Sequence, residues 1–406
     1  MSGITKARMA ESGLYAHTTA YSLVLGAIIV LVPLYILSLG YSPAGLGLII
    51  AGQGVFQVGL RLFGGILSDR LGERWVMQCA LAAMACGSFA LAFSESVFWM
   101  IIAQALFGGS RSIYWVAAQS YGTRIDEDRP AAIMGRFFGF GSAGSIIGNG
   151  GAAVVAATFG FETGFILVAI ISIASMIVVA ITPKIPNPSQ RTLKEILSPV
   201  PKVFLKKAIV LPAILAFGTS LQMGVMGSIG AALFEEFGFL DKDAAITFGM
   251  IAMDKYGFLM STHAIGSVIA GFTFAKFITK AGQQITYALT MGGNGVLLLS
   301  IVFIGDIFLI ATLMMFTLGL AFNSGRVFNS SLTAMASLPE QRGVFMAVVG
   351  IYWALGVFIG PFVFGPLAEL TSLSISISVV GILMLIAAVM TPVLFRITIP
   401  TKNSVD

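Results

Sequence analysis

The amino-acid sequence predicts an all-α integral membrane protein with twelve transmembrane helices in two sets of six. Hydrophobic residues make up 57% of the 406 residues and charged residues only 10%, and the mean hydropathy is +0.95. A soluble domain of this size does not have so apolar a composition. The apolar residues also gather into runs of about 20, the length that crosses a bilayer core.

Six runs form the first half, which we expect to be a bundle over residues 1–182. A polar start precedes the first run, and the turn Leu39-Gly40-Tyr41-Ser42-Pro43 ends it. The expected spans of this half are 13–38, 42–67, 75–93, 97–122, 133–158 and 163–182.

Residues 183–207 read as a linker, because prolines alternate there with six basic residues. A second bundle is expected over 208–406, with spans 208–234, 256–278, 284–304, 307–336, 343–367 and 372–395.

The basic residues predict the orientation. With the N-terminus inside, eighteen of the 23 Lys and Arg residues fall in cytoplasmic segments, and the opposite loops hold only Lys242 and Lys255. This asymmetry is the positive-inside pattern, so both termini are expected in the cytoplasm, with the protein in the inner membrane. Because the basic residues are spread over short loops, the net charge of +5 does not indicate a nucleic-acid partner.

A short charged segment separates the second and third spans. It reads Gly65-Ile66-Leu67-Ser68-Asp69-Arg70-Leu71-Gly72-Glu73-Arg74, and we refer to it as the knot. Gly65 allows close helix packing and Gly72 a sharp reversal of the chain. In order, spacing and position, the knot resembles the cytoplasmic loop motif of the major facilitator superfamily of transporters.

The resemblance implies two pseudo-twofold six-helix bundles that move by alternating access around a substrate site near the midplane. It also implies a role in gating for Gly65, Asp69, Arg70, Gly72 and Arg74. Asp69 is then expected to hold the inward face shut by pairing near Arg342-Gly343. For Arg70 and Arg74 the expected partners are Asp126, Glu127 or Asp128.

The two halves repeat in sequence. Gly108-Gly109-Ser110-Arg111 in the fourth span corresponds to Asn323-Ser324-Gly325-Arg326 in the tenth. Gly271 to Gly282 is a degenerate copy of the knot without its Asp. The second half carries about eight extra residues around 241–255, which are expected outside as either a lid or a plain surface loop.

Arginines inside the membrane are the leading candidates for substrate binding, since a charge there is costly and usually faces a cavity or a partner. Arg111 and Arg326 lie deep and are expected at equivalent places, whereas Arg61 either faces the cavity or extends to the cytoplasmic interface. No Asp or Glu lies at comparable depth. We therefore expect Arg111 and Arg326 to bind an anionic substrate group together.

Other polar and aromatic residues in the spans could line a cavity or bond between helices. The candidates for substrate binding are Gln57, Tyr114, Trp115, Gln222 and Asn329. His17 and His263 titrate nearest to physiological pH, so each is either a carrier of a coupling proton or simply a hydrogen-bonded residue.

The sequence favours a secondary transporter of a small molecule, with the organic anion as the first hypothesis. A proton-coupled drug or metabolite exporter is the alternative, although Ser145 occupies the place where the superfamily's exporters carry a proline. A non-transporting sensor on the same fold is a third. The sequence has only two His and two Cys, and no carboxylates cluster in the predicted spans. It therefore gives no indication of an enzyme, a metal site or a cofactor.

Cys79 and Cys86 lie seven residues apart on one helix face and are expected to be buried, without a disulfide. The first run is too long for a cleaved signal peptide. A monomer in the lipid bilayer, coupled to a proton or another ion, is the expected form.

Overall fold

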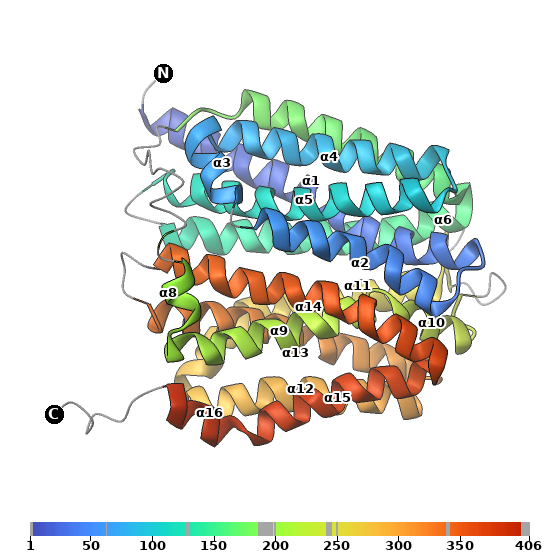
Figure 1. Cartoon of the computed structure of the whole chain (residues 1–406). Helices are drawn as coiled ribbons and strands as arrows, with labels where there is room; N and C mark the ends of the chain where they lie inside the picture. Colours follow the sequence, from blue (N-terminus) through green and yellow to red (C-terminus); the bar gives the residue numbers. More distant parts are fainter. Residues whose placement is uncertain are drawn as a thin grey trace.

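The computed structural model describes residues 3–61, 63–126, 130–185, 198, 200–240, 246–248, 251–337 and 342–398. Helices form nearly all of it (Figure 1). Most of the 183–207 linker, including 186–197, lies outside the described residues.

The first half contains six helices that pack on one another, with α1 against α6, α4 against α5 and α6, and α2 against α5. Their bounds are α1 Gly3–Ser38, α2 Pro43–Leu60, α3 Phe63–Leu71, α4 Glu73–Phe93, α5 Val97–Thr123 and α6 Pro130–Ile181.

The second half packs in the same way, with α11 against α13, α14 against α9, and α12 against α15. Its elements are α8 Val200–Phe204, the 3-10 helix η1 Lys207–Ile209, α9 Val210–Met226, α10 Ile229–Glu236, β1 Ile246–Phe248, β2 Ile251–Met253, α11 Lys255–Ala281, α12 Gln283–Ile304, α13 Phe308–Met335, α14 Arg342–Leu370, α15 Leu373–Val389 and α16 Thr391–Thr398.

The molecule has two distinct ends. Helices α3, α8 and α16 lie at one end, which we name the α3 side, and α10 lies at the other, the α10 side (Figure 1). Among the described residues, nine helices are long and apolar enough to cross a membrane, or ten if the bent pair α15–α16 is one span. The chain thus has the helices of a multi-pass membrane protein. The count of twelve membrane spans remains a prediction.

Three predicted spans are interrupted. The span 42–67 breaks after Leu60, so α2 and α3 are separate helices. Similarly, 208–234 divides at Gly227 into α9 and α10, and 372–395 divides into α15 and α16. In the opposite sense, 133–158 and 163–182 join in the single element α6, which turns at Gly160 with φ 85°.

Positive-φ glycines mark corresponding turns of the two halves. Gly40 and Gly72 have φ of 79° and 83°, and Gly238 and Gly282 have φ of 71° and 79°. Side chains with a Cβ rarely adopt this conformation, which explains the choice of glycine. The first pair is 32 positions apart and the second 44, so the second half holds twelve extra residues here rather than the expected eight or so, with the β1–β2 hairpin among them.

Close glycine contacts give the register between the halves. A Cβ at Gly108 would overlap the carbonyl of Gln53, and one at Gly319 would overlap the carbonyl of His263. Gln53 lies 19 residues before Gly72, as His263 does before Gly282. Gly108 and Gly319 therefore occupy matching places in α5 and α13.

This register corrects one sequence expectation. Arg111, three residues after Gly108, matches Phe322 rather than Arg326. Arg326 matches Trp115, one helical turn further along. The similar segments Gly109-Ser110-Arg111 and Ser324-Gly325-Arg326 suggest a match that is shifted by four residues from the true register.

The prediction of buried cysteines was wrong. Cys79 and Cys86 do lie on one face of α4, but both are exposed. A spacing of seven residues places two side chains on the same helix face, but it does not tell which face points toward the protein interior. In a helix that is apolar all round, the hydrophobic pattern does not distinguish the two faces.

Two seams join the halves. Along one, Gly47 contacts the Pro361 carbonyl and Gly54 contacts Phe358, so α2 lies directly on α14 (Figure 1). Along the other, α6 packs on α11, where Gly257 contacts Ala153. Helices in lipid approach closely where small residues leave room, as they do at both seams.

We expect Gly319→Ala to destabilise the protein by about 1–3 kcal/mol, because the backbone of His263 cannot move aside as a side chain could. Gly293→Ala in α12 is the matched control, since a Cβ there has nothing within 4 Å. Thermal unfolding of the detergent-solubilised variants measures both. Equal melting temperatures for the two variants would contradict the close contact.

Candidate functional site

Three arginines lie near one another between the two halves. Arg61 ends α2, Arg111 is in the middle of α5, and Arg326 is in α13. Their positive charges are close enough that Arg61 is repelled by both others and Arg326 by Arg111. The sequence named these residues as candidates, and the structure brings all three together.

Arg61 reaches from the first half to the second. Its guanidinium lies against Gly350 of α14, where any Cβ would overlap it. The cytoplasmic-interface alternative for Arg61 therefore does not describe this conformation, since the side chain contacts the opposite half.

Arg326 lies beside two aromatic rings that contact each other, with 6.0 Å between the ring centres. Its guanidinium carbon is 5.9 Å from the centre of the Phe322 ring and 5.8 Å from that of Trp353, within the range of cation–π attraction. The His263 ring also faces Phe322, at 5.5 Å between ring centres. One half-buried histidine, two aromatic rings and one arginine thus share a single surface of the second half.

The three guanidinium groups have no protein acceptor or carboxylate within the described ranges. The ion pairs in those ranges lie elsewhere, between Arg124 and Glu73 and between Arg136 and Glu11 at 3.0 Å. Arg326 is exposed and Arg61 and Arg111 are partly exposed, although all three lie deep among the helices. Solvent therefore reaches them from inside the molecule, and their N–H donors are free to bind a ligand.

Comparison with known proteins agrees with this architecture. The sequence model described as Major Facilitator Superfamily matches residues 16–253, more than half of the chain. The chain belongs to the major facilitator superfamily.

Relatives and solved structures of this superfamily cover nearly the whole chain. The quinolone resistance protein NorA of Staphylococcus aureus (strain COL) is 23% identical over 389 residues, which are 92% of this chain and 95% of NorA. The crystal structure of a mutant of the nucleoside transporter NupG has a TM-score of 0.80 at 15% identity, covering 95% of this chain and 100% of NupG.

A third match is a bacterial homologue of the human lysosomal transporter Spinster in an inward-facing and unoccupied conformation. Its TM-score is 0.76 at 13% identity, and the match covers 97% of this chain and 98% of that one. At such identities the two structures establish the fold alone. The expected superfamily fold and the coarse function, a membrane transporter, are confirmed.

His17 belongs to a closed network in the first half of this superfamily fold. Its Nδ1 is 2.7 Å from the Tyr114 hydroxyl, which also donates to Thr18 at 3.4 Å. The Tyr114 ring stacks on Tyr21, and Trp115 meets both rings edge-on. His17, Tyr21 and Tyr114 are all buried, so solvent does not reach them in this conformation.

The amide candidates are less accessible than the arginines. Gln57 and Gln222 are buried, and the side-chain oxygen of each lacks a hydrogen-bond partner, as does that of Asn329. Asn329 is half-buried one turn after Arg326. A role for these residues and for Tyr114 and Trp115 in substrate binding stays a prediction.

Two residues of the site, Phe322 and Gly350, were not among the candidates predicted from the sequence. Phe322 lies four residues before Arg326, so its place on the same helix face could have been read from the spacing. Gly350 is different, because its contact with Arg61 joins two helices from opposite halves and has no local signal.

The knot forms contacts of its own. Glu73 is buried and accepts hydrogen bonds from Arg124 and from Ser120 Oγ, the latter at 3.1 Å. Arg74 donates to the carbonyl of Ala180 rather than to an acidic side chain, and Arg70 is exposed. The expected carboxylate partner of Arg74 is therefore not found. Glu127 and Asp128 and the side chains of Asp69 and Arg342 lie outside the described part.

On the α10 side, side chains tie the seams. Glu369 of α14 accepts hydrogen bonds from Ser42 Oγ at 2.5 Å and from the Ala44 amide at 3.2 Å, at the N-terminus of α2. Asn149 of α6 donates to the Met260 carbonyl of α11 at 3.0 Å. The β1–β2 hairpin adds to the second seam, since Met253 packs near Gly150 of α6.

Asp254 is a half-buried acid that caps a helix. Burial raises the pKa of its carboxyl group, and the hydrogen bond from the Gly257 amide at 2.7 Å lowers it in part. That hydrogen bond satisfies a backbone N–H group in the first turn of α11. Asp254 therefore acts as a helix cap and does not face the arginines.

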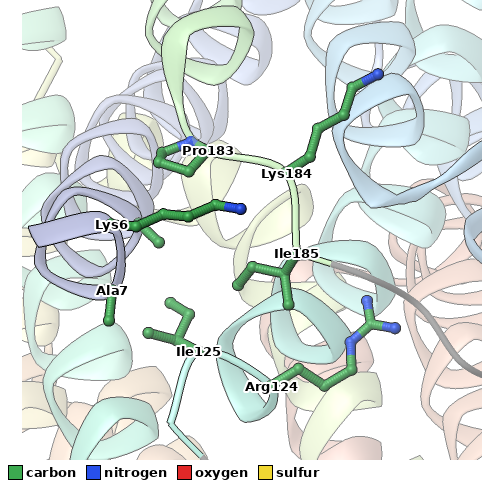
Figure 2. Close-up of a pocket in the computed structure, with 8 residues that line it drawn as sticks. Lys6, Ala7, Arg124, Ile125, Pro183, Lys184 and Ile185 are labelled. Atoms are coloured by element: carbon green, nitrogen blue, oxygen red, sulfur yellow. The ribbon is translucent and has the colours of Figure 1, made fainter. Parts of the chain in front are cut away.

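A small basic pocket lies on the α3 side, with a cavity volume of about 180 Å³ (Figure 2). Lys6 of α1 points into it, whereas Lys184 extends away from it. Since Arg124 in its wall is paired with Glu73 and Lys184 extends away, Lys6 is the one cation of the described lining that points into the pocket. It is weaker as a binding site than the three arginines.

We expect Glu369→Gln to speed hydrogen exchange in the first turn of α2, because a neutral amide is a weaker acceptor than a carboxylate. Exchange of a peptide spanning 42–46, followed by mass spectrometry in nanodiscs, should rise about tenfold. Glu95→Gln, an exposed loop acid, is the control. Unchanged protection in the Glu369 variant would show that this bond does not hold the seam.

Proposed function

We propose that the protein is a secondary transporter that moves a small organic anion across the cytoplasmic membrane by alternating access. Both termini then lie in the cytoplasm, so the α3 side is cytoplasmic and the α10 side is external. Two bundles, over 1–182 and 208–406, would move as units on either side of the arginines.

One observation supports the choice of an anion above all others, namely the three arginines without acidic partners. An arginine near the centre of a spanning helix costs roughly 2.5–3.5 kcal/mol on insertion scales. A protein keeps such residues where they face a ligand or a partner, and the described carboxylates Glu73 and Glu11 form ion pairs with other arginines. The planar guanidinium fork suits an oxyanion and stays charged at any physiological pH.

The seams support an inward-facing state. Their side-chain bonds, Glu369 to Ser42 and Asn149 to Met260, lie toward the α10 side. Helix α3 packs on α4 and α5 of its own half. In this proposal the α10 side is closed and the anion enters and leaves from the α3 side.

A proton-coupled exporter is the second candidate, because NorA is named a quinolone resistance protein. His263 fits a coupling role better than His17, since it is half-buried beside Phe322 and Arg326 whereas His17 is fully buried. A drug cation would be repelled by three arginines, so the charge of the transported molecule separates the two candidates. A sensor would bind ligand without flux.

The knot is proposed as the inner gate. Asp69 would pair across the halves when the α3 side closes, and Glu73–Arg124 would hold the knot on its own half. In this proposal the substrate exchanges while the gate is open.

Labelling of single cysteines tests the orientation. In a variant without Cys79 and Cys86, so that each introduced cysteine is the single thiol, cysteines at Ser96 and Asp306 should react with an impermeant reagent applied to whole cells. A cysteine at Ser198 should react only after the cells are broken. The reversed pattern would refute the proposed topology.

Substitution of the arginines tests the site. A thermal-shift screen of the purified protein against metabolites first supplies a ligand, since binding to the folded state raises its stability. Arg111→Gln and Arg326→Gln should each reduce uptake of that ligand into proteoliposomes by at least tenfold, while Arg111→Lys should weaken apparent affinity more than expression.

The control is Arg396→Gln, an exposed arginine of α16 far from the site in sequence. Normal transport by both glutamine variants, or a cationic substrate, would end the anion hypothesis.

A further inference from the structure

We propose that the central site binds a group with two negative charges, such as a phosphate monoester, and that Arg61 is the third ligand that sets this preference. This inference rests on the proposed anion transport and adds the charge of the substrate. It starts from Arg61, the arginine for which the sequence left the role open.

The charge balance favours a dianion. Arg61, Arg111 and Arg326 repel one another, and none has a carboxylate partner in the described segments. A monoanion would leave two of the three charges uncompensated, whereas a dianion leaves one. Since charges interact more strongly in a site of low dielectric constant than in water, the second negative charge should add affinity.

The hydrogen-bond donors point the same way. Each guanidinium has five N–H donors, and no described acceptor takes any of them from these three residues. A phosphate monoester presents three terminal oxygens, enough to accept from three separate guanidinium groups. A single carboxylate has two oxygens and is matched by one or two arginines.

Gly350 gives Arg61 its place. Because glycine has no Cβ, the Arg61 side chain lies directly on α14, three residues before Trp353 on the same helix. Trp353 in turn flanks Arg326, so α14 positions two arginines that come from different halves. Gly350 is thus a positioning residue and Arg61 a binding residue, and the site is complete only while α2 and α14 keep this arrangement.

The rings suggest where the rest of the substrate lies. Phe322 and Trp353 contact each other beside Arg326, and the half-buried His263 extends this surface. A flat or aromatic body attached to the phosphate could rest there. Phenyl phosphate is therefore a suitable minimal probe.

A matched pair of probes tests the charge preference. Phenyl phosphate and benzenesulfonate have the same ring and a similar oxyanion, but above pH 7 the phosphate is a dianion and the sulfonate a monoanion, since the second pKa of a phosphate ester is about 6. Binding to the purified wild-type protein is measured by thermal shift over a concentration series at pH 8 and pH 5. We expect phenyl phosphate to bind about tenfold more tightly than benzenesulfonate at pH 8, and about equally at pH 5.

Variants assign the preference to Arg61. Arg61→Gln should remove the tenfold advantage of phenyl phosphate and keep benzenesulfonate binding, which also shows that the variant is folded. Gly350→Val keeps the arginine but moves it, so it should remove the advantage as well. Arg396→Gln should leave both affinities unchanged.

The outcomes separate this inference from the proposed function. If both probes bind wild type equally at pH 8, or if Arg61→Gln keeps the advantage, the dianion inference fails while anion binding stands. If neither probe binds, and the transported substrate is uncharged or cationic, the proposed function fails with it.

Discussion

The decisive constraint on this protein is that hydrocarbon offers neither hydrogen bonds nor screening to a charge. Backbone groups in lipid must bond within helices, and charged side chains must turn toward the interior of the bundle. The three central arginines obey this rule without acidic partners among the described residues, so their charge is held where solvent can reach it between the halves. The proposed binding site is thus a consequence of where the fold admits water.

The same constraint explains why glycines lie where helices contact one another. Without a hydrophobic effect between helices in lipid, association depends on close packing, and glycine lets backbones touch. Gly108 on Gln53 and Gly319 on His263 do this within each half, and Gly47 and Gly54 do it between halves. Repetition of one contact in both halves records the internal repeat more faithfully than the residue types that surround it.

Much of the fold could be predicted from the sequence, because span length, loop charge and turn glycines are local signals. Gly72 and Gly282 have the positive φ that their positions suggested. The three arginines were identified as candidates because a charged side chain inside the membrane is energetically costly. Other features depend on packing between distant segments and could not be predicted. These are the contact of Arg61 with Gly350, the Arg124–Glu73 ion pair and the outward direction of Cys79. The repeat register failed because two short polar segments looked alike one turn out of phase.

The β1–β2 hairpin makes the two halves unequal in a way that bears on the transport cycle. It belongs to the second half and packs on α6, and the described part of the α2–α14 seam has no corresponding element. Separating α6 from α11 on that side requires strand β2 to detach as well. Under the proposed alternating access, opening the α10 side would break this contact whereas opening the α3 side would not, so the outward-open conformation would carry a free-energy cost that the other seam lacks.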